Sequence, residues 1–307
     1  MNKLRVVITG GSGLLALNWA CAVRDRWDVI LGTHQHSVDL AGTNSYKLDL
    51  DNHVELGRQL DQLSPDLVIH TVGLTSVDRC EDDCDLARQV NAVIARNVAH
   101  ATASRNIRLI HISTDHLFAG DRSFYLENDP PQPLNEYGRT KALSEAWVQA
   151  ANPKALIIRT NFFCWGQSQR QSFSDWLIYN LRDGKELTLF DDVYFTPILA
   201  DTLALAAHEL IEKGVFGIFN LVGDDRLSKY EFALQLSYQF ELPAELIQRD
   251  QVAHAHLLAS RPRDMSLDNN KARQILDRGL GAVSQFLSTL HAQEIEGRRT
   301  ELLKSIY

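Results

Sequence analysis

The sequence has few cysteines, prolines and glycines, and it has no long apolar run. Its 4 cysteines among 307 residues include no Cys-x-x-Cys pair, which excludes a disulfide framework and favours reduced, structural thiols. The 8 prolines and 17 glycines exclude a fibrous or low-complexity chain. The N-terminal MNKLRVVITGG reaches glycines too early for a signal peptide or a membrane span, so we expect a cytoplasmic protein with no membrane partner.

Positive charge is also scarce. The formal net charge is -8, and Lys and Arg never occur in runs of more than two, which argues against a nucleic-acid partner. Any anionic ligand must therefore be held by a local site. The 11 histidines are scattered, and no His, Asp or Glu set has a metal-ligand spacing, so no metal is expected.

Short apolar runs alternate with longer amphipathic segments through the first half of the chain. This rhythm is typical of strand–helix–strand units in a parallel sheet. It predicts a doubly wound α/β (Rossmann) domain over residues 1–160. The expected strands are 4–9, 28–33, 66–71, 107–113 and 154–160, and the expected helices are 14–26, 54–63, 86–104 and 139–151.

The pattern changes after residue 160, where aromatic residues cluster and single strands appear. We interpret 161–307 as a smaller C-terminal α/β region, mainly for substrate binding. Within it, the segment 197–222 carries a helical pattern followed by a strand and could fold back onto the sheet. Residues 282–306 are expected to form a terminal helix with one solvated face.

A glycine-rich segment follows the first predicted strand and opens the first predicted helix. It reads Thr9-Gly10-Gly11-Ser12-Gly13-Leu14-Leu15-Ala16 and fits both GxGxxA and GxxGxxA. Small residues let backbone N–H groups approach a pyrophosphate, and a helix N-terminus adds a partial positive charge. We therefore expect a dinucleotide site whose cofactor-binding residues are Gly10, Gly11, Ser12, Gly13, Leu14 and Leu15.

The end of the second predicted strand bears on the choice between NADP and NAD. An NAD-selective site places an acid on the adenosine ribose about 20 residues after the glycines, whereas this chain has Gly32-Thr33-His34-Gln35-His36. With no acid to repel a 2′-phosphate and His34 available to contact it, the segment favours NADP(H) and leaves NAD(H) open. In the alternative interpretation both histidines are solvated.

Asp49 and Asp51 follow the short strand-like segment 46–48 and could meet the adenine edge of the cofactor. Leu50, between them, is a further expected cofactor-binding residue. The competing interpretation is that this segment begins the next helix, with Asp51 or Asn52 as its N-cap.

A tyrosine and a lysine spaced by four residues begin the helical pattern before residue 151. Tyr137 and Lys141 would share one helix face, where an ammonium stabilises a phenolate and moves its pKa toward the working range. Ser113, Thr114 and Asp115 stand at the end of the preceding predicted strand. Ligands of parallel sheets bind at the carboxyl ends of strands, so these residues are expected to lie near the reacting group.

The glycine-rich segment, Ser113-Thr114-Asp115 and Tyr137-x-x-x-Lys141 together resemble an extended short-chain dehydrogenase/reductase. The finer resemblance is to the dTDP-4-dehydrorhamnose reductase family. It rests on stretches that follow the family's order: PDLVIHTVGLTSVDRCEDD (65–83), VNAVIARNVAHA (90–101), HISTDHLFAG (111–120), YLENDPPQPLNEYGRTKALSE (125–145) and RPRDMSLDNNK (261–271).

This resemblance implies a role for each catalytic residue. Tyr137 would be the general acid, Lys141 would lower its pKa and hold the nicotinamide ribose, and Thr114 would hydrogen-bond the keto oxygen, with Ser113 as the fallback. Arg261 would bind the phosphates of a nucleotide sugar, unless it only forms a surface salt bridge. The implied reaction is NAD(P)H-dependent reduction of a nucleotide-activated 4-keto-6-deoxy sugar, most simply dTDP-4-dehydrorhamnose to dTDP-rhamnose.

The chain departs from the family near the expected sugar site, which leaves the sugar open. His70-Thr71-Val72-Gly73-Leu74 stands where the family commonly has Asn-Ala-Ala-Ala-Tyr, and His116 replaces a tyrosine. Two alternatives remain. One is an epimerase or dehydratase of the same superfamily, and the other is a non-catalytic NADP-binding subunit resembling the methionine adenosyltransferase beta subunit. A homodimer is compatible with each of these.

Overall fold

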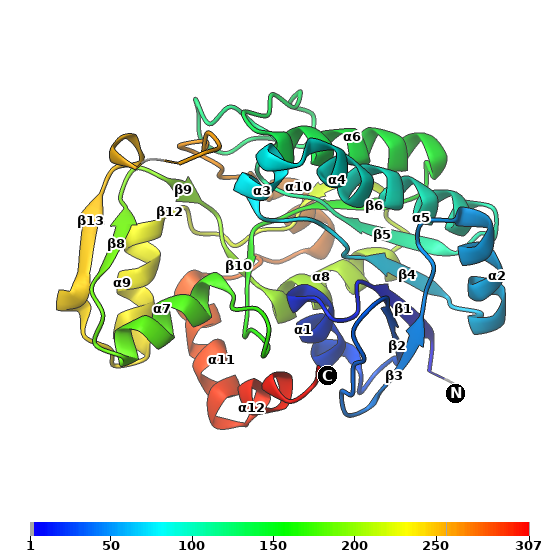
Figure 1. Ribbon diagram of the computed structural model, residues 1–307, viewed down its shortest axis with the longest axis horizontal. Helices are drawn as coiled ribbons and strands as arrows, with labels where there is room; N and C mark the ends of the chain where they lie inside the picture. The colour runs from blue at the N-terminus through cyan, green and yellow to red at the C-terminus, as the bar shows by residue number, and fades with distance from the viewer. Residues whose placement is uncertain (1–2, 256, 307) are drawn as a thin grey trace.

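The computed structural model describes residues 3–255 and 257–306. Within them, seven parallel strands form a central sheet in the order β11-β6-β5-β4-β1-β2-β3 (Figure 1). The chain moves outward from β1 in both directions, so the predicted doubly wound α/β fold is confirmed. The strands are β1 (Arg5–Thr9), β2 (Asp28–Thr33), β3 (Thr43–Lys47), β4 (Leu67–His70), β5 (Arg108–Ile112), β6 (Leu156–Arg159) and β11 (Gly217–Asn220).

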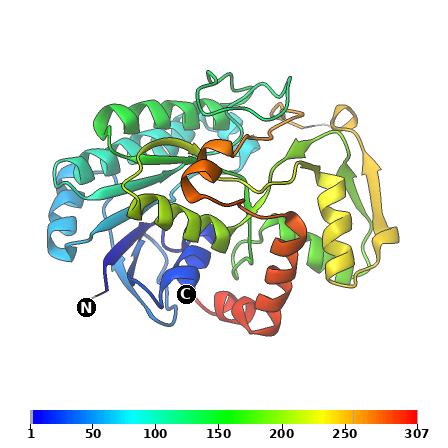
Figure 2. The same ribbon diagram turned by 180° about the vertical axis from the view of Figure 1, so that it is seen from behind.

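Alternate side chains of the inner strands point to opposite faces of the sheet, and helices cover both faces. Val7, Val68 and Leu109 pack with one helix layer, while Val6 and Ile8 pack with the other. Figures 1 and 2 show the two layers from opposite sides. The first layer holds α2 (His53–Leu63), α5 (Ile94–Ala103) and α6 (Glu136–Ala151), and the second holds α1 (Leu14–Val23) and α8 (Ala200–Glu212).

The helix expected over 86–104 is interrupted. It consists of α4 (Cys84–Arg88), a π-helical turn (Gln89–Val93) and α5, and it is preceded by α3 (Val77–Asp82). A π turn adds one residue to the helix and is frequent at functional sites. The amphipathic pattern predicted the helix but carried no signal for this local widening.

The chain after residue 160 contributes to the sheet as well as to a separate group of elements. β11 pairs with β6 at the edge of the sheet, and α8 packs against α1. Most of the other elements lie beyond the carboxyl ends of the strands (Figure 1), although the helix 270–276 packs against α8 and β11. These other elements are β7 (Phe162–Phe163), α7 (Phe173–Arg182), β8 (Leu187–Phe190), β9 (Tyr194–Phe195), β10 (Ile198–Leu199), β12 (Leu227–Ser228), α9 (Lys229–Gln239), β13 (Ile247–Asp250), α10 (Asn270–Leu276), α11 (Val283–Ile295) and α12 (Arg298–Leu303).

The prediction of one terminal helix over 282–306 is wrong. Gly297 separates α11 from α12 and has a φ of 88°, a left-handed conformation that glycine adopts without a steric penalty. After α12 the chain pairs with the loop that follows β2, where the Asp39 amide donates to the Ser305 carbonyl at 2.9 Å. None of the helices in the described residues combines the length and apolar character needed to span a membrane.

Candidate active site

The loop between β1 and α1 has the close backbone packing expected of a phosphate-binding turn. Gly10 has a φ of 74°, and an added Cβ would lie 3.0 Å from the Val72 side chain. A Cβ on Gly11 would lie 2.8 Å from Leu31. Gly13 is the N-cap of α1, and no side chain caps this helix. The amides of the first turn, which include those of Leu14 and Leu15, have no intrahelical acceptor and can receive an anion.

The residues predicted for the adenosine end of the site lie in two different settings, an exposed loop after β2 and the N-terminal cap of α2. His34 follows β2 directly and is exposed at the carboxyl end of that strand, where a ribose phosphate would lie. Asn52 caps α2, since its side chain accepts from the amides of Val54 and Glu55. Asp49 supports this turn by accepting from the amide of Asp51 at 3.1 Å.

The Leu50 carbonyl, in the same turn, accepts a hydrogen bond of 3.1 Å from the Asn97 side chain. The local bonds therefore match the capping interpretation, and cofactor contacts by Asp49, Leu50 and Asp51 stay a prediction.

The structure brings Thr114, Tyr137 and Lys141 together at the carboxyl end of β5. All three are buried. The Thr114 hydroxyl accepts from the His116 amide at 3.2 Å, donates to Asp115 at 3.2 Å, and lies close enough to Tyr137 to lower the tyrosine's pKa. Ser113, the fallback for Thr114, is also buried, but its hydroxyl has no hydrogen-bond partner among the described residues.

The pKa of Tyr137 differs from the sequence-based expectation. Burial is the main reason that it rises to about 12; the charge of Asp115 acts in the same direction, while Thr114 and the charge of Arg170 lower it. The lowering expected from the neighbouring ammonium is therefore wrong for the protein alone, because desolvation of the phenolate is the largest influence on this pKa and raises it. Tyr137 consequently holds its proton and can act as a proton donor.

Lys141 is fixed by the sheet. Its ammonium donates to the Ile112 carbonyl oxygen at 2.7 Å, and burial lowers its pKa to about 8 against the charge of Glu145. Two buried histidines lie on the strands beside it. His70 and His111 are register partners on β4 and β5, their rings are stacked with centroids 5.4 Å apart, and the charge of Lys141 helps to lower both pKa values.

The π-helical turn joins the loop after β4 to α6, the helix that carries Tyr137 and Lys141. Its Asn91 side chain accepts from the Leu74 amide at 2.7 Å and donates to the Thr140 hydroxyl at 3.0 Å. Thr140 directly precedes Lys141. The segment 90–101 contributed to the family resemblance seen in the sequence, but no role was predicted for Asn91.

Arg261 lies near the site but is already paired. Its guanidinium donates to Asp78 at 2.9 Å and to the Ala259 carbonyl at 3.0 Å, and it is close enough to His116 to affect the pKa of that imidazole. The position suits a ligand facing the catalytic loop. The salt bridge matches the alternative role, so phosphate binding by Arg261 stays a prediction.

Comparison with known proteins gives the same assignment as the motifs. Residues 4–291 match the model of the family described as RmlD substrate binding domain. The chain belongs to this family. The family resemblance predicted from the sequence is therefore confirmed.

Two relatives of this RmlD-family protein are named differently from each other, one as a reductase and one as a subunit of methionine adenosyltransferase. The probable low-salt glycan biosynthesis reductase Agl14 of Haloferax volcanii is 31% identical, and the match covers 93% of this chain and 96% of the relative. Methionine adenosyltransferase 2 subunit beta of Pongo abelii is 26% identical, with 92% and 84% covered.

Two solved structures are similar over almost their whole length. A hypothetical dTDP-4-dehydrorhamnose reductase from Sulfolobus tokodaii has 33% identity and a TM-score of 0.79, with 91% of this chain and 97% of that chain covered. The dTDP-4-dehydrorhamnose reductase of Bacillus anthracis in complex with NADP has 24% identity and a TM-score of 0.84, with 95% and 99% covered. The second likeness supports the fold.

One residue of this RmlD-family protein was missed by sequence reasoning. Lys229, the first residue of α9, places its ammonium 3.3 Å from the centroid of the Phe195 ring, and Asp115 is near enough to raise its pKa. These contacts join segments that are far apart in the sequence. No local motif marks Lys229.

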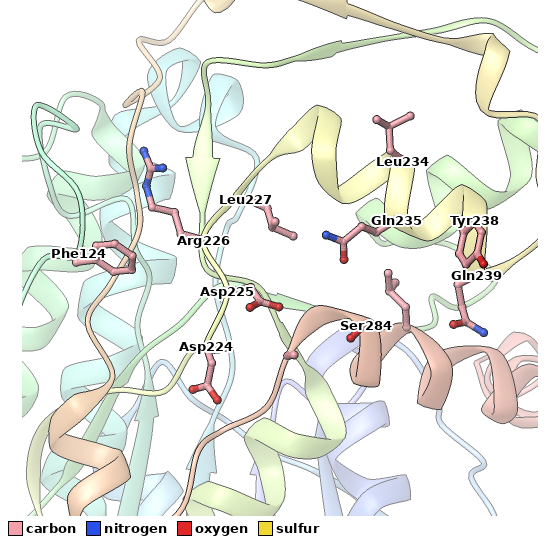
Figure 3. A pocket seen from close by; sticks show the side chains of 12 residues that line it. Phe124, Asp224, Asp225, Arg226, Leu227, Leu234, Gln235, Tyr238, Gln239 and Ser284 are labelled. Atoms are coloured by element: carbon pink, nitrogen blue, oxygen red, sulfur yellow. The ribbon is translucent and has the colours of Figure 1, made fainter.

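A surface pocket of about 1010 Å³ lies elsewhere, between α9, α11 and the segment before β12 (Figure 3). Arg226 lines it and forms a salt bridge with Asp264, with the guanidinium 3.8 Å from the centroid of the Tyr194 ring. Thr114, Tyr137 and Lys141 are not among the residues that line the pocket. We therefore do not place the reaction there.

Among the described residues, no group of three His, Cys, Asp or Glu side chains could hold a metal ion.

Proposed function

We propose that this protein is an NADPH-dependent reductase of a nucleotide-activated 4-keto-6-deoxy sugar. One observation carries the proposal. Buried Tyr137, whose raised pKa keeps it protonated, lies with Thr114 and Lys141 at the carboxyl end of the sheet, which also holds the glycine-rich loop. The Agl14 relative, named as a reductase, supports the same class of reaction.

The chain's own residues fit a dinucleotide. The uncapped N-terminus of α1 leaves its first amides available to a pyrophosphate at Gly10, Gly11, Ser12 and Gly13, and Gly10 and Gly11 allow the turn to pack closely on Val72 and Leu31. A bound nicotinamide supplies the hydride. No acidic residue directly follows β2 to repel a 2′-phosphate, and exposed His34 is at that position, which favours NADPH over NADH.

The protein's part of the reaction is to orient the ketone and supply a proton. Thr114 and Tyr137 hydrogen-bond the keto oxygen, and Tyr137 transfers its hydroxyl proton to that oxygen as the carbonyl carbon is reduced. The positive charge of Lys141 stabilises the phenolate that remains. The Ile112 carbonyl oxygen at the end of β5 holds this ammonium in place. The ketone thus becomes an alcohol.

The experiment follows NADPH absorbance while the protein acts on dTDP-4-dehydro-6-deoxy sugar, with Tyr137→Phe as the test variant. We expect stoichiometric NADPH oxidation by the parent protein and a loss of turnover of about 100-fold or more in the variant, with NADPH binding retained. Unchanged turnover in Tyr137→Phe would overturn the mechanism. Sugar conversion without net NADPH consumption would identify an epimerase or dehydratase instead.

The similarity to methionine adenosyltransferase 2 subunit beta over 92% of the chain favours a second candidate. In that case the protein is a non-catalytic NADP-binding subunit. NADPH binding with no turnover of any nucleotide keto sugar would support it. The joint presence of Thr114, Tyr137 and Lys141 favours the reductase.

A further inference from the structure

The helix that carries Tyr137 and Lys141 is held at its first residue by a carboxylate from another helix. The backbone amide of Glu136, the first residue of α6, donates to the Glu81 side chain of α3 at 2.7 Å. An amide in the first turn of a helix has no acceptor within the helix, so it needs one from elsewhere. Glu81 supplies that acceptor from 55 residues earlier in the chain, at the residue directly before Tyr137.

The same turn of α6 is held at a second amide. Asn135, the N-cap of α6, is buried, and its side chain accepts from the Gly138 amide at 2.9 Å. This side chain also donates to the Ser260 carbonyl at 2.9 Å, which joins the turn to the C-terminal region. Tyr137 therefore lies between the amide that Glu81 holds and the amide that Asn135 holds.

Glu81 can hold α6 in place only if α3 is itself fixed, and contacts on two sides fix it. One turn before Glu81, the Asp78 carboxylate accepts from a backbone amide and from a guanidinium of the segment 259–261, at 3.1 and 2.9 Å. Between the two acids, Cys80 is buried and belongs to one apolar cluster with Tyr137. The short helix is therefore anchored both to the C-terminal region and to the tyrosine itself.

The contact between Glu81 and α6 acts on Tyr137 through the backbone. The carboxylate and the guanidinium whose charges act on the pKa of Tyr137 are those of Asp115 and Arg170. Glu81 instead binds the amide one residue before the tyrosine. What α6 needs at this place is a hydrogen-bond acceptor, and a neutral acceptor of similar length can replace the carboxylate.

A second helix is held in the same way, away from the catalytic set. The amide of Val283, the first residue of α11, donates to the Asp225 carboxylate at 2.8 Å, across 58 residues of chain. Asp225 lines the surface pocket in Figure 3. If such a bond only stabilises the helix that it holds, removal of either carboxylate lowers stability alone. α6 differs from α11 because it carries the proton donor.

We propose that Glu81 is a positioning residue for Tyr137 and acts through the Glu136 amide that it holds. This assignment rests on the proposed function. Proton transfer to the keto oxygen requires the donor to lie within hydrogen-bond reach, and a displacement of about 1 Å can lower the rate by about 100-fold. By fixing the first turn of α6, Glu81 keeps the Tyr137 hydroxyl at the place where the ketone is reduced.

The test compares the kinetics of NADPH oxidation by the full-length protein and two variants, with the dTDP-4-dehydro-6-deoxy sugar as substrate. Glu81→Ala is expected to lower kcat by about 10-fold or more and to change KM for the sugar by less than about 3-fold, because it displaces the proton donor and leaves the substrate contacts in place. Glu81→Gln should keep kcat within about 3-fold of the parent, since its amide oxygen still accepts from the Glu136 amide.

Asp225→Ala is the matched control, because it removes a carboxylate from the first amide of α11. It should lower Tm to a similar extent as Glu81→Ala and leave kcat equal to that of the parent. An equal loss of kcat in Asp225→Ala would show a general effect of lost stability and overturn the proposal. A kcat of Glu81→Gln as low as that of Glu81→Ala would also overturn it, because an acceptor alone would then not suffice.

Hydrogen exchange tests the contact without turnover. With NADPH bound, the Glu136 amide should exchange slowly in the parent, faster in Glu81→Ala, and slowly again in Glu81→Gln. Slow exchange of this amide in Glu81→Ala would overturn the proposal, because another group would then hold the turn.

The outcomes distinguish this assignment from the proposed function. Parent-like kcat in Glu81→Ala, in a protein that reduces the sugar nucleotide, would overturn the positioning role and leave the reductase standing. A parent protein that binds NADPH but reduces no sugar nucleotide would overturn the proposed function and the positioning role together. The supporting result is a loss of kcat and of amide protection in Glu81→Ala, with both restored in Glu81→Gln.

Discussion

The Lys141 ammonium donates a 2.7 Å hydrogen bond to the carbonyl oxygen of Ile112, the last residue of β5. This bond joins the catalytic helix α6 to the strand that leads into Thr114. It fixes the lysine with respect to the hydroxyl that contacts Tyr137. Because burial lowers the pKa of Lys141 to about 8, its charge is lost within an accessible pH range.

We predict that turnover falls as the pH rises through about 8, because neutral Lys141 no longer stabilises the phenolate of Tyr137. The measurement is kcat for NADPH oxidation between pH 6.5 and 9.5 at saturating substrate. Lys229 titrates in the same range. The series is therefore repeated in Lys229→Arg, and disappearance of the alkaline decline of kcat in that variant would contradict the role of Lys141.

A second prediction concerns the backbone of the phosphate loop. Gly10→Ala places a Cβ 3.0 Å from the Val72 side chain at a φ of 74°, so it is expected to lower stability by about 2 kcal/mol or more and to weaken NADPH binding. Gly184→Ala is the matched control, since Gly184 has a φ of 70° with no atom within 4 Å of an added Cβ. It should show only the backbone strain, about 1 kcal/mol, with unchanged NADPH affinity.

The measurements for this pair are urea unfolding and NADPH titration of both variants. Equal stability losses in Gly10→Ala and Gly184→Ala would mean that the loop relaxes to accept a methyl group. The close approach of the turn to the segment after β4 would then have no functional meaning.

Local pattern explains which parts of the fold were predictable. The strands β1, β2, β4, β5 and β6 lie within the predicted runs, because buried parallel strands read as continuous apolar segments. The phosphate loop and the pair Tyr137 and Lys141 were predictable because each depends on residues close in sequence. The break of the terminal helix at Gly297 was not anticipated, since an isolated glycine also occurs inside helices.

Long-range contacts explain what the sequence could not show. The Lys229 ammonium lies on the Phe195 ring and Asp115 influences its pKa, and these two residues come from β9 and from the loop after β5. The pKa of Tyr137 was predicted to be lowered but is raised in the structure. The reason is that its burial depends on tertiary packing, which the spacing of Tyr137 and Lys141 in the sequence does not show. For Tyr137, desolvation in the assembled core decides the chemistry.

The buried His70 gives the last prediction, which concerns acid stability. Burial and the charge of Lys141 lower its pKa to about 3, whereas the unfolded chain protonates this residue near pH 6.5. Between those values the unfolded state binds more protons, so the free energy of unfolding falls as the pH is lowered. His70 should contribute about 1.4 kcal/mol per pH unit to this loss.

The His70→Asn variant should therefore lose less stability than the parent between pH 6.5 and pH 4.5, even if it is less stable at pH 7 because the 2.7 Å hydrogen bond between His70 and Thr9 is gone. Urea unfolding at a series of pH values measures the slope. His36→Asn, on an exposed loop, is the control and should follow the parent curve. Parallel curves for His70→Asn and the parent would show that the imidazole is protonated in the folded state, because only a group with different proton occupancy in the two states changes the slope.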